Sequence, residues 1–247
     1  MALAFSGAKF SCICADLCDS LLLMKTIAYV DGYNLYFRLL RKNRENRWLN
    51  IESLIRNALD DSVDITKINY YTARVKGQID REAPGKQQRY LNALSSLPVL
   101  DVHFGRFSMH EKWAGLIQPP RFLPETEMPE PYPDVVKVRR AEEKGSDVNL
   151  ATHLVRDAFK GAFEQAVVIT NDTDLIEPIR VVVEEVGLPV GLLAPVEQPA
   201  RTLKAVASWF LHLKPGDAAK CQFPDQVPFG RGKLALRPED WCERGEE

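Results

Sequence analysis

Short apolar runs alternate with stretches of helical periodicity along most of the chain. The runs are rich in β-branched and aromatic residues and predict strands at residues 27–30, 67–73, 99–107, 166–169 and 189–193. Apolar residues with helical spacing predict helices at residues 34–44, 51–59, 85–95, 147–159, 175–185 and 200–210. This alternation predicts an α/β fold whose central, mostly parallel sheet is covered by helices on both faces.

Three segments interrupt the pattern. Residues 113–134 contain six prolines, which exclude regular helix or central strand, so we expect a long surface loop followed by a return strand at residues 134–139. The pattern fades after Pro215, and we expect residues 213–247 to be a loosely packed tail. Residues 1–24 are expected to be an extension, either not native or disordered, because Met24 directly precedes the first strand. The main domain is then residues 25–212.

Composition limits the cellular compartment and the binding partners that can be expected. The 247 residues are 45% hydrophobic and 27% charged, as in ordinary globular proteins, and the net charge of −2 requires any nucleic-acid surface to be a local patch. No run approaches the roughly 20 apolar residues of a membrane helix, so no membrane partner is expected. Five cysteines, an odd number, argue against a disulfide framework and favour a reducing cytoplasm.

Aspartates occur where this topology would gather them. Asp31 and Asp172 follow the first and fourth strands, and Asp147 and Asp174 stand at the starts of the next helices. Ligands of parallel sheets bind beyond the carboxyl ends of the strands, so the four carboxylates should converge if these two strands are neighbours. Carboxylates that close repel one another, and oxygen ligands suit Mg²⁺ or Mn²⁺.

Each acid also has a purely structural explanation. Asp31-Gly32 could form a turn, Asp147 could cap its helix, and Asp174 with Glu177 matches a capping box.

At these positions the chain resembles the NYN family, a branch of the PIN-like nuclease superfamily with many bacterial members. The resemblance rests on Val30-Asp31-Gly32-Tyr33-Asn34-Leu35, on residues 144–151, and on Thr170-Asn171-Asp172-Thr173-Asp174-Leu175. It implies a Rossmann-like PIN fold and an Mg²⁺- or Mn²⁺-dependent endoribonuclease. By position, Asp31, Asp147, Asp172 and Asp174 match the family's catalytic and metal-binding acids, Asn34 matches the residue that orients the first acid, and Thr170 matches a hydroxyl near the metal.

Two positions depart from the family pattern. His153 stands where relatives often carry an aspartate, and Asn171 where many have glycine. His153 could alter the site or could be a polar residue on a helix flank.

Basic and aromatic residues could hold an RNA substrate. Lys144 precedes the second acidic block and could contact a phosphate. One cluster comprises Arg38, Arg41, Lys42, Arg44 and Arg47, and another comprises Lys137, Arg139, Arg140 and Lys144. Tyr33, Tyr36, Phe37 and Trp113 could stack on bases. Solvated charged faces and core aromatics are the structural alternatives.

Other functions remain open from sequence. A haloacid dehalogenase-type phosphatase would need Asp-x-Asp where the chain has Asp31-Gly32-Tyr33. A pyridine-derivative hydroxylase is suggested by some proteins that resemble this family, but no G-x-G-x-x-G turn is present. A non-catalytic RNA-binding module and a small-molecule phosphoesterase are further alternatives. The sequence leaves open whether the chain forms a homodimer.

Overall fold

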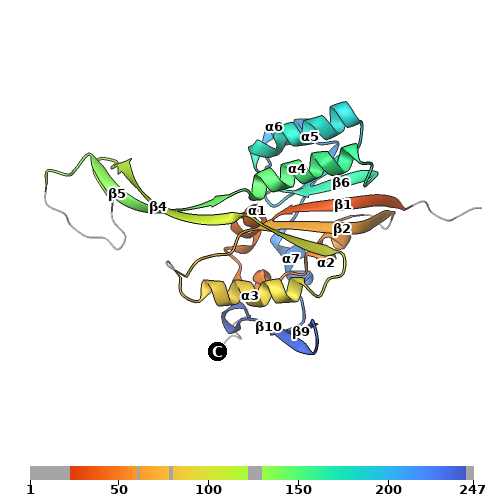
Figure 1. Ribbon diagram of the computed structural model, residues 1–247, viewed down its shortest axis with the longest axis horizontal. Coiled ribbons are helices and arrows are strands. Elements are labelled where there is room, and N and C mark those ends of the chain that lie inside the picture. Colours follow the sequence, from red (N-terminus) through yellow and green to blue (C-terminus); the bar gives the residue numbers. More distant parts are fainter. Residues whose placement is uncertain (1–22, 60–61, 78–79, 122–129, 243–247) are drawn as a thin grey trace, which may run out of the picture.

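A six-stranded parallel sheet forms the centre of the protein (Figure 1), as seen in a computed structural model that describes residues 23–59, 62–77, 80–121 and 130–242. The strand order is β3-β2-β1-β6-β7-β8, and every neighbouring pair is parallel. The strands are β1 (Met24–Asp31), β2 (Val63–Thr72), β3 (Leu100–Phe104), β6 (Gln165–Ile169), β7 (Val190–Ala194) and β8 (Trp209–His212). The predicted parallel sheet is confirmed, and the first and fourth strands are neighbours as β1 and β6.

Helices cover both faces of this sheet, as predicted (Figure 1). One face carries α2 (Ile51–Ala58), α3 (Ala83–Leu94) and α7 (Pro215–Lys220); the other carries α4 (Ser146–Phe159), α5 (Ile176–Arg180) and α6 (Arg201–Val206). The short α1 (Gly32–Leu35) continues into the π-helix η1 (Tyr36–Leu40). Each face buries its own hydrophobic cluster, as alternating side chains of buried strands require. None of the helices within the described ranges is long and apolar enough to span a membrane.

The predicted third strand divides into two elements. The chain leaves the sheet at Gly105, and β4 (Arg106–Gly115) pairs with β5 (Val135–Lys144) in an antiparallel ribbon that projects from the body. We call this ribbon the arm. A side chain at Gly105 would stand 2.9 Å from the carbonyl oxygen of Lys144, so glycine permits the close crossing. The prediction of a loop is wrong for residues 113–115, because β4 continues to Gly115. Residues 122–129 of the predicted loop lie outside the described residues.

The last predicted helix is too long. It ends at Val206, and residues 209–212 form the edge strand β8 beside β7. The indole of Trp209 occupies the space that a side chain at Gly191 would need, so the two strands pair closely at this point. Aromatic Trp209 and Phe210 suit a strand better than a helix.

The prediction of a loosely packed tail is wrong. Beyond α7, the strands β9 (Gln226–Phe229) and β10 (Lys233–Leu236) form a hairpin, and the 3-10 helix η5 (Glu239–Trp241) follows. Phe223, Val227 and Trp241 are buried in the same cluster as Trp48. The prediction failed because these apolar residues are spread among turns and lack a helical or strand period. The predicted extension, residues 1–24, lies outside the described residues except for its last two positions, where Met24 begins β1.

Candidate metal centre

Three carboxylates meet beyond the carboxyl ends of β1 and β6. Val30 pairs with Ile169, so Asp31 and Thr170 leave the two strands side by side. Asp31, Asp147 and Asp172 each offer an oxygen, and these atoms lie within 4.8 Å of one another. Asp147 comes from the first turn of α4, and Asp172 from the loop that follows β6. This geometry gives an oxygen-only site of the kind that Mg²⁺ and Mn²⁺ prefer.

Asp31 is the most buried of the three, with 3% of its surface exposed. Its two oxygens accept hydrogen bonds from the Asn34 backbone N–H (2.9 Å) and from the Thr170 hydroxyl (3.1 Å). Burial raises the pKa of Asp31, and the hydrogen bonds from Asn34 and Thr170 partly oppose that rise. No basic side chain among the described residues forms an ion pair with Asp31, so its carboxylate is available to bind a cation.

Asp147 is half-buried and faces the other acids. Burial, followed by the nearby charges of Asp31 and Asp172, raises the pKa of Asp147 to about 6. Smaller effects in the same direction come from Glu143 and Asp174. Without a cation, Asp147 therefore takes up a proton at a higher pH than an ordinary aspartate does, and a divalent cation would compete with that proton.

Asp174 is exposed and lies outside this three-carboxylate group, on the 3-10 helix η3 (Thr173–Leu175). Its backbone N–H donates to Asp172 Oδ1 (3.1 Å). The capping box suggested for Asp174 and Glu177 is not formed, because Leu175 caps α5 without a side-chain hydrogen bond and Glu177 pairs with Arg180.

The predicted supporting residues connect the acids to the fold. The Asn34 side-chain oxygen accepts from the Asn171 N–H (3.1 Å), and the Asn171 side chain accepts from the Ala200 N–H (3.0 Å) at the start of α6. Thr170 also accepts from the Asp172 N–H (3.0 Å). Asn171 therefore links the loop after β6 to Asn34 and to the start of α6. Lys144 is exposed and approaches Glu142 (3.8 Å).

His153 belongs to a different cluster, between α4 and the sheet. Its Nδ1 lies 3.0 Å from the Tyr71 hydroxyl, and its ring packs edge-on against His103, with centroids 4.8 Å apart. Burial lowers the pKa of both imidazoles. These contacts are those of a packed helix flank, the structural alternative given above.

Sequence reasoning missed Glu143 and a neighbouring pocket. Glu143, at the base of the arm, accepts from the Ser146 hydroxyl (2.8 Å) and adds negative charge beside Asp147. A pocket of about 410 Å³ is lined by residues of α1 and η1. It is lined by Tyr33, Tyr36, Phe37, Tyr70, Tyr90 and Trp241, with Arg44, Arg47 and Lys86 among its charged residues. The pocket could not be found from sequence because η5 closes it from the far end of the chain.

The predicted basic residues are distributed over two regions. Arg38, Arg41 and Lys42 are exposed on η1 and the turn after it, and Arg41 lies over the Phe37 ring (5.5 Å). Arg139 and Arg140 lie on opposite faces of the arm, near Glu111 and Glu142 respectively. Trp113 is 69% exposed near the outer end of β4.

Comparisons with known proteins place this geometry in context. The chain is 28% identical to 6-hydroxy-3-succinoylpyridine 3-monooxygenase HspA from Pseudomonas putida, over 88% of this chain and 75% of the relative. A crystal structure of a protein of unknown function from Vibrio parahaemolyticus matches with a TM-score of 0.47 and 14% identity, covering 78% of this chain and 94% of the other. The family model of the NYN domain matches residues 25–214, and the chain therefore belongs to the NYN family.

Proposed function

We propose that this protein is an Mg²⁺- or Mn²⁺-dependent ribonuclease that hydrolyses phosphodiester bonds. The observation that carries the proposal is the convergence of Asp31, Asp147 and Asp172 within 4.8 Å at the carboxyl edge of the sheet. Membership of the NYN family supports it, because this domain has a nuclease-like fold. We also propose that the substrate is RNA, that the metal is Mg²⁺ or Mn²⁺, and that the protein acts in the cytoplasm.

The three acids fit a divalent cation. Asp31 is buried without an ion pair among the described residues, and the pKa of Asp147 is raised to about 6 by burial and by its carboxylate neighbours. Such a site is costly without a positive charge. Asp31, Asp147 and Asp172 would hold the ion, and Asp174 would assist through water. When bound, the cation supplies Lewis-acid chemistry: it lowers the pKa of water and neutralises phosphate charge.

The chain's own residues orient the site. Thr170 and Asn34 hold the Asp31 carboxylate by hydrogen bonds to both oxygens. The Asp174 N–H holds Asp172 Oδ1, leaving the other oxygen of Asp172 free to face the group. In this proposal, exposed Lys144 would contact a phosphate adjacent to the scissile one, and exposed Phe37 would stack on a base.

The test is hydrolysis of single-stranded RNA by the full chain with Mn²⁺, compared with Asp172→Asn. We expect the substitution to lower the rate by at least about a hundredfold, because it removes a charged oxygen that would hold the cation. The fold should be retained, since Asn can still accept from the Asp174 N–H. Equal rates for the two proteins would contradict the proposal. Glu177→Gln, on the exposed side of α5, is the matched control and should cleave normally.

A second candidate function is oxidation of a hydroxylated pyridine, favoured by the name of the Pseudomonas putida relative and by the aromatic-lined pocket of about 410 Å³. A pocket of this size and character suits a small planar ligand. Loss of 6-hydroxy-3-succinoylpyridine on incubation with the protein, O2 and a two-electron reductant, insensitive to Asp172→Asn, would favour this function. Binding of RNA without cleavage, unchanged by Asp172→Asn, would instead indicate a binding module. Metal-dependent hydrolysis of a small phosphodiester but not of RNA would indicate a phosphoesterase.

A further inference from the structure

The two faces of the arm differ in charge. Successive residues of a strand point to opposite faces, and the pairing of Arg106 with Lys144 fixes which side chains lie together. One face, which we call the basic face, carries Arg106, His110, Lys112, Arg140, Glu142 and Lys144. The other, the mixed face, carries Glu111, Lys137, Arg139 and Glu143.

Glu142 is the one carboxylate on the basic face among the described residues. Glu142 is approached by Arg140 (3.2 Å), Lys144 (3.8 Å) and Lys112 (3.9 Å), and it lies 3.4 Å from His110 Nε2. Arg106 is exposed and forms no ion pair within the described residues. Four permanently basic side chains therefore face one carboxylate, a surplus of three positive charges.

The mixed face carries no such surplus. Lys137 and Arg139 are both paired with Glu111, at 2.6 Å and 3.8 Å, and Glu143 adds a second carboxylate. Its two positive charges are balanced by two negative ones. A solvated ribbon has no need for this asymmetry, because exposed ion pairs contribute little to stability. The uneven distribution instead suits a polyanion bound along one face.

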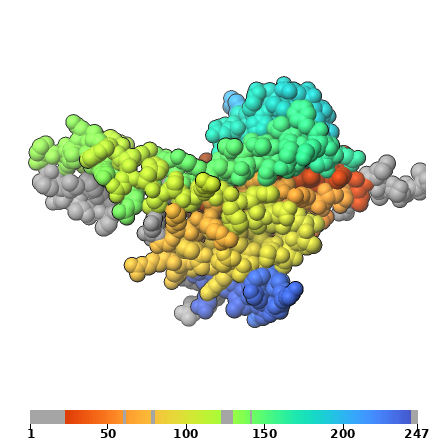
Figure 2. Space-filling view, viewed as in Figure 1, coloured from red at the N-terminus to blue at the C-terminus, as the bar shows by residue number. Residues whose placement is uncertain are grey.

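The arm leads from open solvent to the acidic site. Figure 2 shows it projecting from the body of the molecule, in yellow-green and green. Its length is about 33 Å for ten residues per strand. Lys144, at its base, is three residues before Asp147, so their Cα atoms are at most about 11 Å apart. The acids themselves repel phosphate, and a cationic surface next to them would capture it.

We propose that the basic face of the arm binds the phosphate backbone of the RNA strand that enters the acidic site. This inference rests on the proposed ribonuclease function and adds to it the surface that holds the substrate. Arg106, Lys112, Arg140 and Lys144 share one face through the strand register and form charge-assisted hydrogen bonds to phosphate oxygens. Arg139, grouped with Arg140 on sequence, lies on the mixed face and is not part of this surface.

Two double variants of the full chain separate the faces. Lys112→Gln with Arg140→Gln removes two charges from the basic face, and Lys137→Gln with Arg139→Gln removes the same number from the mixed face of the same two strands. Binding of a fluorescent single-stranded RNA 20-mer is measured in EDTA at several salt concentrations, so that no cleavage occurs. Thermal unfolding verifies that both variants remain folded.

The basic-face variant should bind RNA at least roughly tenfold more weakly at 0.1 M salt, and its slope of log affinity against log salt should be shallower by about 1.4. The mixed-face variant should bind within about twofold of the wild type. Equal losses in both variants, no loss in either, or no RNA binding by the wild type would overturn the inference.

Failure of the surface and failure of the proposed function give different results. If Asp172→Asn abolishes cleavage but the basic-face variant binds like the wild type, the ribonuclease function stands and the surface is wrong. If RNA binds to the basic face but is not cleaved with Mn²⁺, the surface stands and the catalytic proposal is wrong.

Discussion

At the scale of single residues, the acidic site depends on unequal environments for similar side chains. Asp31 is buried and held by two hydrogen bonds, Asp147 is half-buried among carboxylates, and Asp174 is exposed. The sequence predicted that Asp31, Asp147, Asp172 and Asp174 would all converge at one edge of the sheet, and oxygens of Asp31, Asp147 and Asp172 do lie within 4.8 Å of one another. It could not separate Asp174 from them or include Glu143, since both depend on how a loop and the arm cross that edge.

The raised pKa of Asp147 predicts a pH-dependent affinity for metal. Its pKa of about 6 in the metal-free protein means that the carboxylate is mostly ionised at pH 7.5 and mostly protonated at pH 5. A proton competes with the cation, so Mn²⁺ affinity, measured by calorimetry, should fall as pH decreases through this range. Asp147→Asn should bind Mn²⁺ more weakly and with a flatter pH profile. A profile identical to that of the wild type would show that Asp147 is not a ligand.

Proton linkage also gives the sign for stability without metal. An aspartate has a pKa near 3.9 when unfolded, so between about pH 4 and pH 6 the folded protein binds more protons at Asp147. Its contribution therefore disfavours the folded state increasingly as pH rises through that window. At neutral pH and without metal, Asp147 therefore lowers the free energy of unfolding, and the rest of the fold must offset this loss. Such a cost is expected for a functional group of acids.

At the scale of secondary-structure elements, the parallel sheet followed from period and composition, whereas the elements that leave the sheet did not. The Asp31-Gly32 pair reads as a turn in sequence. In the structure it joins β1 directly to α1, with Asp31 as the N-cap. A Cβ atom at Gly32 would lie 2.6 Å from both the Tyr71 carbonyl oxygen and the Tyr70 ring. Such a close approach between elements far apart in sequence is invisible before the fold is known.

This close approach predicts the effect of Gly32→Ala. The added methyl group must displace the backbone of β2 or the buried Tyr70 ring, at a cost of about 1–3 kcal/mol in the free energy of unfolding. Because Gly32 follows Asp31, Mn²⁺ affinity should fall as well. Gly85→Ala is the control: its added methyl group meets no atom within 4 Å in α3, and alanine there should stabilise by about 0.5–1 kcal/mol. Urea denaturation of both variants measures the difference; equal stabilities would contradict the structure.

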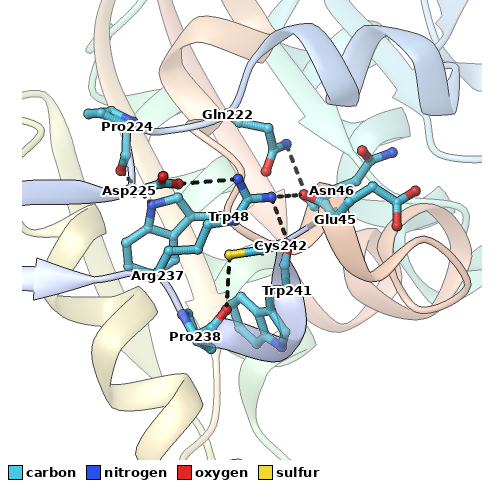
Figure 3. Close-up of polar contacts among 10 residues, drawn as sticks. All are labelled: Glu45, Asn46, Trp48, Gln222, Pro224, Asp225, Arg237, Pro238, Trp241 and Cys242. Atoms are coloured by element: carbon cyan, nitrogen blue, oxygen red, sulfur yellow. Dashed lines mark hydrogen bonds and ion pairs between the residues drawn. The ribbon is translucent and has the colours of Figure 1, made fainter. Parts of the chain in front are cut away.

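At the scale of the whole molecule, residues that follow the main parallel sheet complete the core. The family model ends at residue 214, yet Phe223, Val227 and Trp241 pack into the cluster that contains Trp48. The Trp48 indole N–H donates to the Pro224 carbonyl oxygen (2.8 Å; Figure 3). Trp241 of η5 lines the aromatic pocket. The pocket therefore requires both ends of the described chain to fold together.

Arg237 is the polar link that fastens this segment. Its guanidinium donates to the carbonyl oxygens of Glu45 (2.5 Å) and Trp241 (2.7 Å), and it faces the Asp225 carboxylate at 3.5 Å (Figure 3). Arg237→Ala leaves these partly buried carbonyls without their donor, and we expect a loss of about 2–4 kcal/mol in the free energy of unfolding. Arg231→Ala, at an exposed position in the same hairpin, should change it by less than about 0.5 kcal/mol.

Measurements at the aromatic pocket can distinguish local unfolding of the C-terminal segment from a general loss of stability. If Arg237 fixes η5, then Arg237→Ala should release Trp241 from its contacts with Trp48 and Tyr90, whose ring centroids lie 6.3 and 6.4 Å away. Tryptophan fluorescence should shift to the red, and hydrogen exchange should increase over residues 223–242 before the sheet opens. The acids are held by β1, β6 and α4, so Mn²⁺ affinity should stay within about twofold of the wild type under folding conditions. Loss of metal binding together with these changes would mean that the C-terminal segment supports the acidic edge as well as the pocket.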